Sequence, residues 1–259
     1  MVSVSAPGSA EPPVAFLLDV DNTLLDNDRV QEDLRDHLQN QFGTASRDRY
    51  WAILEQQRSE LGYTDYLGAL QRYRTDELRD SATYEPRLLQ MSSFLVDYPF
   101  TERLYPHVFE VIAHLHRWGP TVIVSDGDVV FQPRKVQRSG LWRAVHGRVL
   151  IYIHKELMLT DVQRRYSARH YVMVDDKLRI LAAMKAALRE RLTTVFPRQG
   201  HYALDPHNLT SYPSADSDLT VECIGELLRH DFSYLTADER SRKPPSLSQS
   251  TRSQQSSTD

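Results

Sequence analysis

The sequence has only one cysteine, Cys223, among its 259 residues. A single cysteine excludes a framework of disulfide bonds within the chain. Because Cys223 stands in an apolar stretch, we expect its side chain to be buried as a small hydrophobic residue. A chain with one free thiol suits a reducing compartment, and we expect a cytoplasmic location.

The sequence also lacks long hydrophobic runs and a strong excess of charge of one sign. Its apolar runs are shorter than the roughly 20 residues that cross a bilayer, so we expect no membrane partner. The formal net charge is only -4, which gives no bias toward nucleic acid. Residues 1–13 carry no pattern of a secretory signal. We expect them to be flexible, and we expect the polar residues 240–259 to be disordered.

What the chain does contain is a short apolar run, Val14–Leu18, that leads into two carboxylates, Asp19 and Asp21. Such a run predicts a buried strand of a parallel sheet, and open α/β sheets bind ligands at the carboxyl ends of their strands. A carboxylate can attack phosphorus, and a second carboxyl group can transfer the protons. We therefore predict Asp19 as nucleophile and Asp21 as acid/base, with Thr23 holding the loop by a hydrogen bond. The competing interpretation is an ordinary strand followed by an Asx turn, which uses the same residue types and has no catalytic role.

A second apolar run, at residues 121–124, is followed by Ser125, Asp126 and Gly127. Ser125 offers a hydroxyl, and the glycine leaves room for a backbone N–H to approach an anion closely. This segment predicts a phosphate-binding loop, although a polar strand-to-helix turn has the same composition.

Two further runs end in a lysine and in a pair of acids. Lys155 follows one run, and its ammonium would neutralise both a nucleophilic carboxylate and a phosphate oxygen. Lys135 is the competing candidate for that role. The other run ends in Asp175 and Asp176, which would supply oxygen ligands for a magnesium ion.

The two spaced acids, the serine, the lysine and the acid pair, each after a predicted strand and in this order, give the chain a resemblance to a known family. It resembles the haloacid dehalogenase-like (HAD) hydrolase superfamily, over roughly residues 14–230. The resemblance implies that Mg²⁺ is held by Asp176, the Asp19 side chain and the Asp21 backbone carbonyl. It also implies that Asp175 orients Lys155 or a metal-bound water. Many relatives have Gly-Asp where this chain has two acids, so the acid that touches the metal stays open, with Asp176 favoured. The residues implied to bind the phosphoryl group are Ser125, Asp126, Gly127 and Lys155.

The spacing of the apolar segments predicts an α/β fold with a parallel sheet and an inserted helical domain, and the resemblance implies a HAD-like Rossmannoid core. We assign the core to residues 14–25 and 104–235 and the insertion to 26–103, which resembles the α-helical cap of type-one HAD proteins. Strands are predicted at Val14–Leu18, Thr121–Val124, Val149–Ile153, Tyr171–Val174, Thr193–Phe196 and Leu219–Val221. Helices are predicted at Val30–Phe42, Arg47–Leu61, Tyr66–Leu78, Arg87–Val96, Val108–Trp118, Gln132–Leu141, Leu178–Arg189 and Ile224–Arg229.

Within the insertion, the segment that carries Arg58, Tyr63 and Tyr66 is the best candidate for contact with substrate. Arginine suits a second anionic group, and tyrosine suits a sugar or an aromatic ring. The same residues also suit simple packing of the insertion and a solvated surface.

The resulting interpretation is a magnesium-dependent phosphohydrolase that acts on a small phosphorylated metabolite through an aspartyl-phosphate at Asp19. A phosphotransferase would use the same groups. A hydrolytic haloacid dehalogenase, which attacks carbon without a metal, is the alternative enzyme, and Asp21 argues against it. A non-catalytic binding or regulatory protein of the same fold is the third possibility. Phosphonate cleavage is disfavoured because residues 26–103 contain no lysine. The sequence does not predict an oligomeric state.

Overall fold

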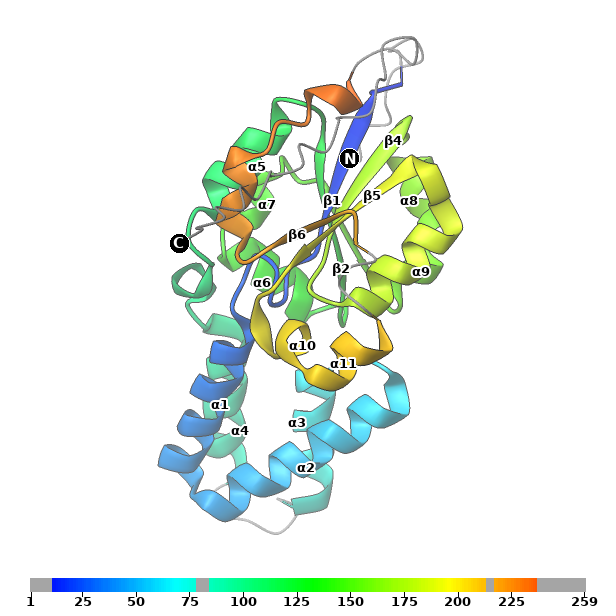
Figure 1. Ribbon diagram of the computed structural model, residues 1–259. Helices are drawn as coiled ribbons and strands as arrows, with labels where there is room; N and C mark the ends of the chain where they lie inside the picture. The colour runs from blue at the N-terminus through cyan, green and yellow to red at the C-terminus, as the bar shows by residue number, and fades with distance from the viewer. Residues whose placement is uncertain (1–10, 78–83, 213–216, 237–259) are drawn as a thin grey trace, which may run out of the picture.

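The computed structural model describes residues 11–77, 84–212 and 217–236. Six parallel strands form one sheet in the order β3-β2-β1-β4-β5-β6 (Figure 1). All six strands agree with the sequence predictions to within two residues at either end. The strands are β1 (Val14–Leu18), β2 (Thr121–Asp126), β3 (Val149–Tyr152), β4 (His170–Val174), β5 (Leu192–Pro197) and β6 (Leu219–Val221).

Strand β1 lies in the middle of the sheet, and every one of its residues is buried. It pairs with β2 on one side and with β4 on the other, with Leu18 opposite both Ile123 and Val174. The strand order reverses at β1, and such a switch point opens a crevice at the carboxyl ends of the strands. Residues that directly follow β1, β2 and β4 are therefore brought together.

Alternate residues of β1 face two different apolar layers, as expected for a strand buried on both faces. Phe16 and Leu18 pack into the layer that contains the helix α5, whereas Ala15 and Leu17 pack into the layer that contains α8 and α9. The helices of the core are α5 (Val108–His116), α6 (Phe131–Arg138), α7 (Leu141–Ala144), α8 (Leu159–Arg165), α9 (Leu178–Leu188), α10 (Gly200–Leu204) and α11 (Pro206–Ser211).

Among the described residues, four α-helices lie between β1 and the core helix α5 in the chain, and we call residues 27–97 the helical insertion. Figure 1 shows the insertion beyond the carboxyl end of β1, close to α10 and α11. Buried aromatic groups hold it together, and the Tyr50 hydroxyl donates to the Tyr66 carbonyl at 2.8 Å. The four helices are α1 (Asn27–Phe42), α2 (Thr44–Leu61), α3 (Tyr66–Glu77) and α4 (Tyr84–Asp97).

Several sequence expectations need correction. The helix predicted at 132–141 is two helices, because Gly140 adopts a left-handed conformation with φ of 85° between them. The segment Ile224–Arg229 is a 3-10 helix. Cys223 is exposed, because it stands in the turn that follows β6.

The chain ends are described only in part. The Pro12 and Pro13 carbonyls accept hydrogen bonds from the Arg169 and His170 N–H groups, each at 3.1 Å, so this part of the segment expected to be flexible is fixed beside β4. Residues 1–10 and the predicted disordered tail at 240–259 lie outside the described residues. None of the helices in the described part has both the length and the apolar character needed to cross a membrane.

Candidate active site

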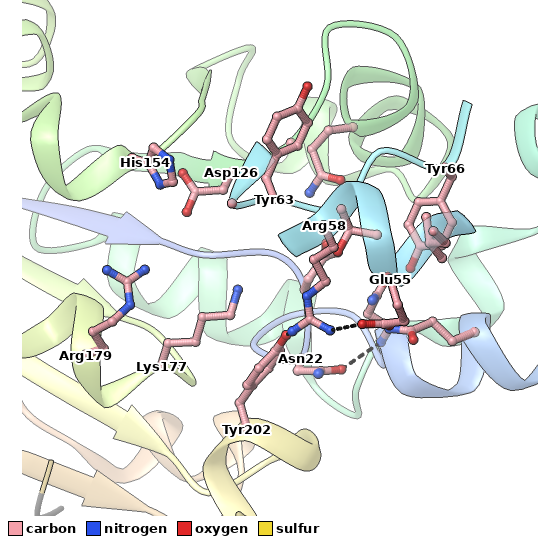
Figure 2. Close-up of a pocket in the computed structure, with 18 of the residues that line it drawn as sticks. Asn22, Glu55, Arg58, Tyr63, Tyr66, Asp126, His154, Lys177, Arg179 and Tyr202 are labelled. Carbon is pink, nitrogen blue, oxygen red and sulfur yellow. Dashed lines mark hydrogen bonds and ion pairs between the residues drawn. The ribbon is translucent and has the colours of Figure 1, made fainter. Parts of the chain in front are cut away.

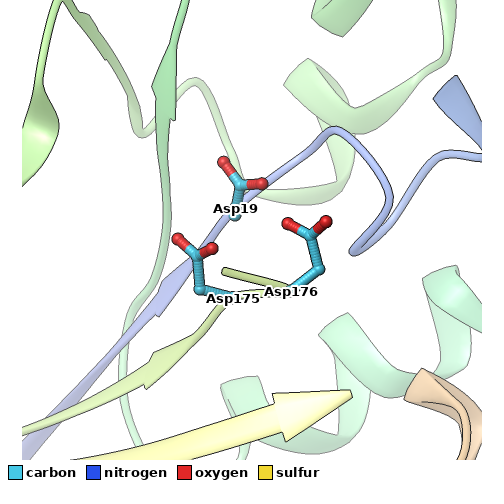
Figure 3. A group of neighbouring side chains, drawn as sticks. All are labelled: Asp19, Asp175 and Asp176. Atoms are coloured by element: carbon cyan, nitrogen blue, oxygen red, sulfur yellow. The ribbon is translucent and has the colours of Figure 1, made fainter. Parts of the chain in front are cut away.

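Three buried carboxylates meet where β1 and β4 end. Asp19 is 2% exposed, and Asp175 and Asp176 are fully buried. Each offers an oxygen, and these oxygens lie within 4.8 Å of one another (Figure 3). The sheet explains the meeting, because the Asp19 N–H donates to the Val174 carbonyl at 3.0 Å and so fixes the two strand ends side by side.

Lys155 provides the positive charge for this cluster. Its ammonium contacts Asp19 and lies 2.7 Å from Asp175 Oδ2. Burial opposes a charge at this position, but the Asp175 and Asp19 carboxylates outweigh burial and raise the pKa of Lys155. The side chain therefore stays an ammonium. His154, the residue before it, is held in the left-handed region with φ of 62°, a conformation that often marks a functional site.

The acid pair is short of compensating charge. Burial raises the pKa of Asp175 to about 6 and raises the pKa of Asp176 well above its usual range. Both carboxylate oxygens of Asp176, and Oδ2 of Asp19, are buried without a hydrogen-bond partner among the described residues. Orphaned buried carboxylate oxygens are costly unless a cation binds them. The donor set, made only of hard oxygens, fits a divalent cation such as Mg²⁺.

Asp21 lies apart from this cluster and faces a different lysine. The Lys135 ammonium, which is completely buried, donates to Asp21 Oδ1 at 2.6 Å and to Asn27 Oδ1 at 3.0 Å. The Asp21 side chain is 25% exposed. The two candidate lysines thus have separate partners, with Lys155 beside Asp19 and Lys135 beside Asp21.

The loop after β2 differs from the expectation in two respects. The Gly127 N–H donates to the Tyr152 carbonyl at 2.9 Å, so this donor is used within the sheet and does not face an anion. The Asp126 carboxylate accepts the Lys155 N–H at 2.7 Å. It positions Lys155, and a carboxylate would repel a phosphoryl group. Ser125 is buried, and its hydroxyl accepts a hydrogen bond from Gln132 at 3.0 Å.

The loop after β1 is fixed by side chains at both ends. Thr23 Oγ1 accepts the Asp176 N–H at 3.1 Å, which ties the loop to the end of β4. Asn22, with φ of 60°, accepts the N–H groups of Asn27 and Asp28 and so begins the helix α1. The loop that carries Asp21 is therefore also the anchor of the helical insertion.

A cavity of about 280 Å³ lies between the helical insertion and the core (Figure 2). The three residues predicted to contact substrate all line it: Arg58, Tyr63 and Tyr66. From the core, Asp21 and Tyr202 line the same cavity. Arg58 also bonds to the Tyr202 hydroxyl, which joins the insertion to α10 across the cavity.

Sequence reasoning missed several residues of the site. Asn22 shapes the loop, Asn27 accepts a hydrogen bond from Lys135, and Tyr202 lies on the cavity wall. Lys177 also lines the cavity and was visible in the sequence as the residue directly after the acid pair. The two asparagines had no signal, because their roles depend on how the loop folds.

Comparisons with known proteins show the family of the chain. The model of the haloacid dehalogenase-like hydrolase family matches residues 14–187. A crystal structure from Burkholderia xenovorans, described as a haloacid dehalogenase-like hydrolase, is 63% identical, with 85% of this chain and 99% of that one covered and a TM-score of 0.79. The chain belongs to the haloacid dehalogenase-like hydrolase family. No curated protein matches this HAD-like hydrolase.

More distant structures share the fold alone. A HAD-hydrolase of Bacillus subtilis, solved bound to magnesium, is 18% identical, with 85% of this chain and 98% of that one covered and a TM-score of 0.54. The L-2-haloacid dehalogenase of Xanthobacter autotrophicus is 17% identical, with 83% and 96% covered and a TM-score of 0.53. The two neighbours therefore do not decide between chemistries for this HAD-like hydrolase.

Proposed function

We propose that this HAD-like hydrolase is a magnesium-dependent phosphohydrolase of a small phosphorylated metabolite. The observation that carries the proposal is the presence of a second acid, Asp21, two residues after the buried Asp19, together with the unpartnered oxygens of Asp176 beside it. Attack on phosphorus needs a nucleophile, a proton donor and a divalent cation. The site offers residues for all three needs.

In the proposed reaction an oxygen of Asp19 attacks phosphorus, and the bond from phosphorus to the leaving oxygen breaks. Asp21 gives a proton to that leaving oxygen. Water then attacks phosphorus, Asp21 takes a proton from the water, and the bond between phosphorus and Asp19 breaks to release phosphate. Because Lys135 binds Asp21 Oδ1, the other oxygen, Oδ2, is left for proton transfer.

Lys155 keeps a positive charge beside the Asp19 carboxylate and would stabilise the negative charge that gathers on the phosphoryl oxygens. Magnesium would be held by Asp19, Asp176 and the Asp21 carbonyl, and when bound it would neutralise phosphoryl charge. Ser125 is the remaining candidate for a hydrogen bond to the phosphoryl group.

The helical insertion would act as a cap that excludes bulk water from the reacting groups. Support comes from the cavity that it forms with the core and from the contact between Arg58 and Tyr202 across that cavity. A volume of about 280 Å³ suits a small substrate. A folded macromolecule could not place a phosphoryl group below such a cover.

The proposal is tested by phosphate release from p-nitrophenyl phosphate and from a panel of phosphorylated metabolites, with Mg²⁺ and with EDTA. We expect release with Mg²⁺ and its loss with EDTA. A haloacid dehalogenase would need neither Asp21 nor a metal. Halide release from haloacids, with no phosphate release from any ester, would therefore overturn the proposal in favour of that chemistry.

A further inference from the structure

Lys177 is a cation on the cavity wall to which the reaction above gives no task. It is half-buried and lines the cavity directly after the acid pair. Among the described residues its ammonium makes no hydrogen bond or ion pair and lies over the Tyr202 ring, 5.0 Å from the centroid. Arg179 lines the same wall, but its guanidinium is paired with Glu156 at 2.6 Å. The positive charge of Lys177 is therefore not paired with an acidic side chain among the described residues.

Arg58 approaches the same ring from the helical insertion. Its guanidinium carbon lies 5.5 Å from the Tyr202 centroid, and Figure 2 shows Lys177 and Arg58 on either side of that tyrosine. The ion pair of Arg58 with Glu55 is long, at 3.4 Å, and both side chains are more than one third exposed. Such a pair contributes little and gives way easily to a better anion. One cation from the core and one from the insertion thus lie beside the same tyrosine on the cavity wall.

We infer that Lys177 and Arg58 together bind a second anionic group of the substrate. The substrate class is then a small phosphate ester that also carries a carboxylate or a second phosphate. Carboxylate and phosphate groups accept charge-assisted hydrogen bonds from both lysine and arginine, and these bonds are the strong ones. Tyr202 is the spacer that sets where the two cations meet the ligand.

The second anion is a separate group from the phosphoryl group that is transferred. Transfer takes place at Asp19, which is 2% exposed and already has Lys155 beside it. Lys177 instead lies over the ring of Tyr202, which belongs to α10, and Arg58 lies at the hydroxyl of that tyrosine on the cavity wall. A ligand that reaches both places must have its two anions at its two ends.

This inference rests on the proposed function, so its test uses binding rather than turnover. The protein is the full chain with Asp19→Asn, which keeps the cavity and removes the nucleophile, in the presence of Mg²⁺. Titration calorimetry compares 3-phosphoglycerate with glycerol 3-phosphate, which differ by one carboxylate. A second comparison, of fructose 1,6-bisphosphate with fructose 6-phosphate, replaces the carboxylate by a phosphate.

We expect the ligand with two anionic groups to bind about tenfold more tightly in at least one pair, the size of one charge-assisted hydrogen bond. Adding Lys177→Met should reduce that preference to about twofold, whereas Lys177→Arg should keep most of it. Arg179→Met is the matched control, because it removes a cation of the same wall that is already paired, and it should keep the preference. The pair that shows the preference identifies the second anion.

Three results would overturn the inference. One is the absence of a preference in both pairs. Another is a preference that survives Lys177→Met. The third is equal weakening of both ligands of a pair by Lys177→Met, which would place the lysine on the transferred phosphoryl group. Failure of the proposed function looks different: the unmutated protein would release no phosphate with Mg²⁺, while the binding preference and its loss in Lys177→Met remained.

Discussion

Replacing Lys155 by methionine should destabilise the metal-free protein severely. Lys155 is 1% exposed and is the direct cationic partner of Asp19 and Asp175, which are themselves 2% and 0% exposed. Methionine has a similar length and fills the space, so the loss of charge is the main change. Two carboxylates would then remain buried against each other without a counter-charge.

The structure sets the size of this effect. Breaking a buried ion pair from one side costs about 3–5 kcal/mol, because the partner is left as an uncompensated buried charge. Lys155→Met should lower the free energy of unfolding by that amount at pH 8, where the carboxylates must be charged or pay for protonation. A second change, Asp175→Asn, removes one of the stranded charges and should recover roughly half of the loss.

The assay is urea unfolding followed by circular dichroism, with EDTA present in every sample. Lys135→Met is the matched control. It removes the other buried lysine, but its partner Asp21 is 25% exposed and can be hydrated, so we expect a loss of only about 1–2 kcal/mol. If Lys155→Met unfolds within about 1 kcal/mol of the unmutated protein, or if Asp175→Asn worsens it, the electrostatic account of the site is wrong.

Three other predictions concern activity, acid stability and the fit of the insertion. Asp19→Asn should abolish phosphate release while the circular dichroism spectrum stays unchanged, and full activity in this variant would refute the mechanism. The second prediction concerns Asp33. Burial raises the pKa of this carboxyl group, but hydrogen bonds from the Tyr98 hydroxyl and from Arg103 outweigh burial and lower the pKa below the unfolded value near 3.8. The Asp33 carboxylate therefore contributes stability above about pH 4, and this contribution disappears as the pH falls through the lowered pKa. Asp33→Asn should lower the free energy of unfolding by about 1 kcal/mol at pH 7. An equally large loss in strong acid would contradict the assignment. Gly62 has φ of 79°, and a Cβ there would lie 2.7 Å from His154 Cε1. Gly62→Ala should therefore push the insertion away from the core and raise KM for small phosphate esters more than it lowers kcat. An unchanged KM would show that the close approach of insertion and core does not shape the cavity.

The core of the fold could be predicted from the sequence because each buried strand is a short apolar run that ends in polar residues. The acids after two of these runs, Asp19 and the pair Asp175 and Asp176, could be placed together for the same reason, since parallel strands end at one edge of a sheet. The helices of the insertion were also predicted by their apolar spacing, with ends that differ by up to three residues.

The parts that could not be predicted depend on backbone geometry or on distant packing. The hydrogen bond from Gly127 to the Tyr152 carbonyl extends β2 beyond its last apolar residue, and composition does not reveal such an extension. From the sequence, Lys135 and Lys155 are competing candidates for the lysine beside the nucleophile. In the structure each lysine has its own carboxylate partner, Asp21 for Lys135 and Asp19 for Lys155. The position of Lys177 after the acid pair is visible in the sequence, but only the structure shows that its side chain lines the cavity.

The most direct test of the central claim is to trap the phosphoenzyme. Asp21→Asn removes the base needed for the second step, whereas the p-nitrophenolate leaving group needs no proton in the first. With p-nitrophenyl phosphate and Mg²⁺, this variant should release about one equivalent of p-nitrophenol in a burst and carry a phosphoryl group on Asp19, detected by rapid quench and peptide mass spectrometry. A burst with Asp19 unmodified, or turnover that continues at the full rate, would contradict the aspartyl-phosphate mechanism.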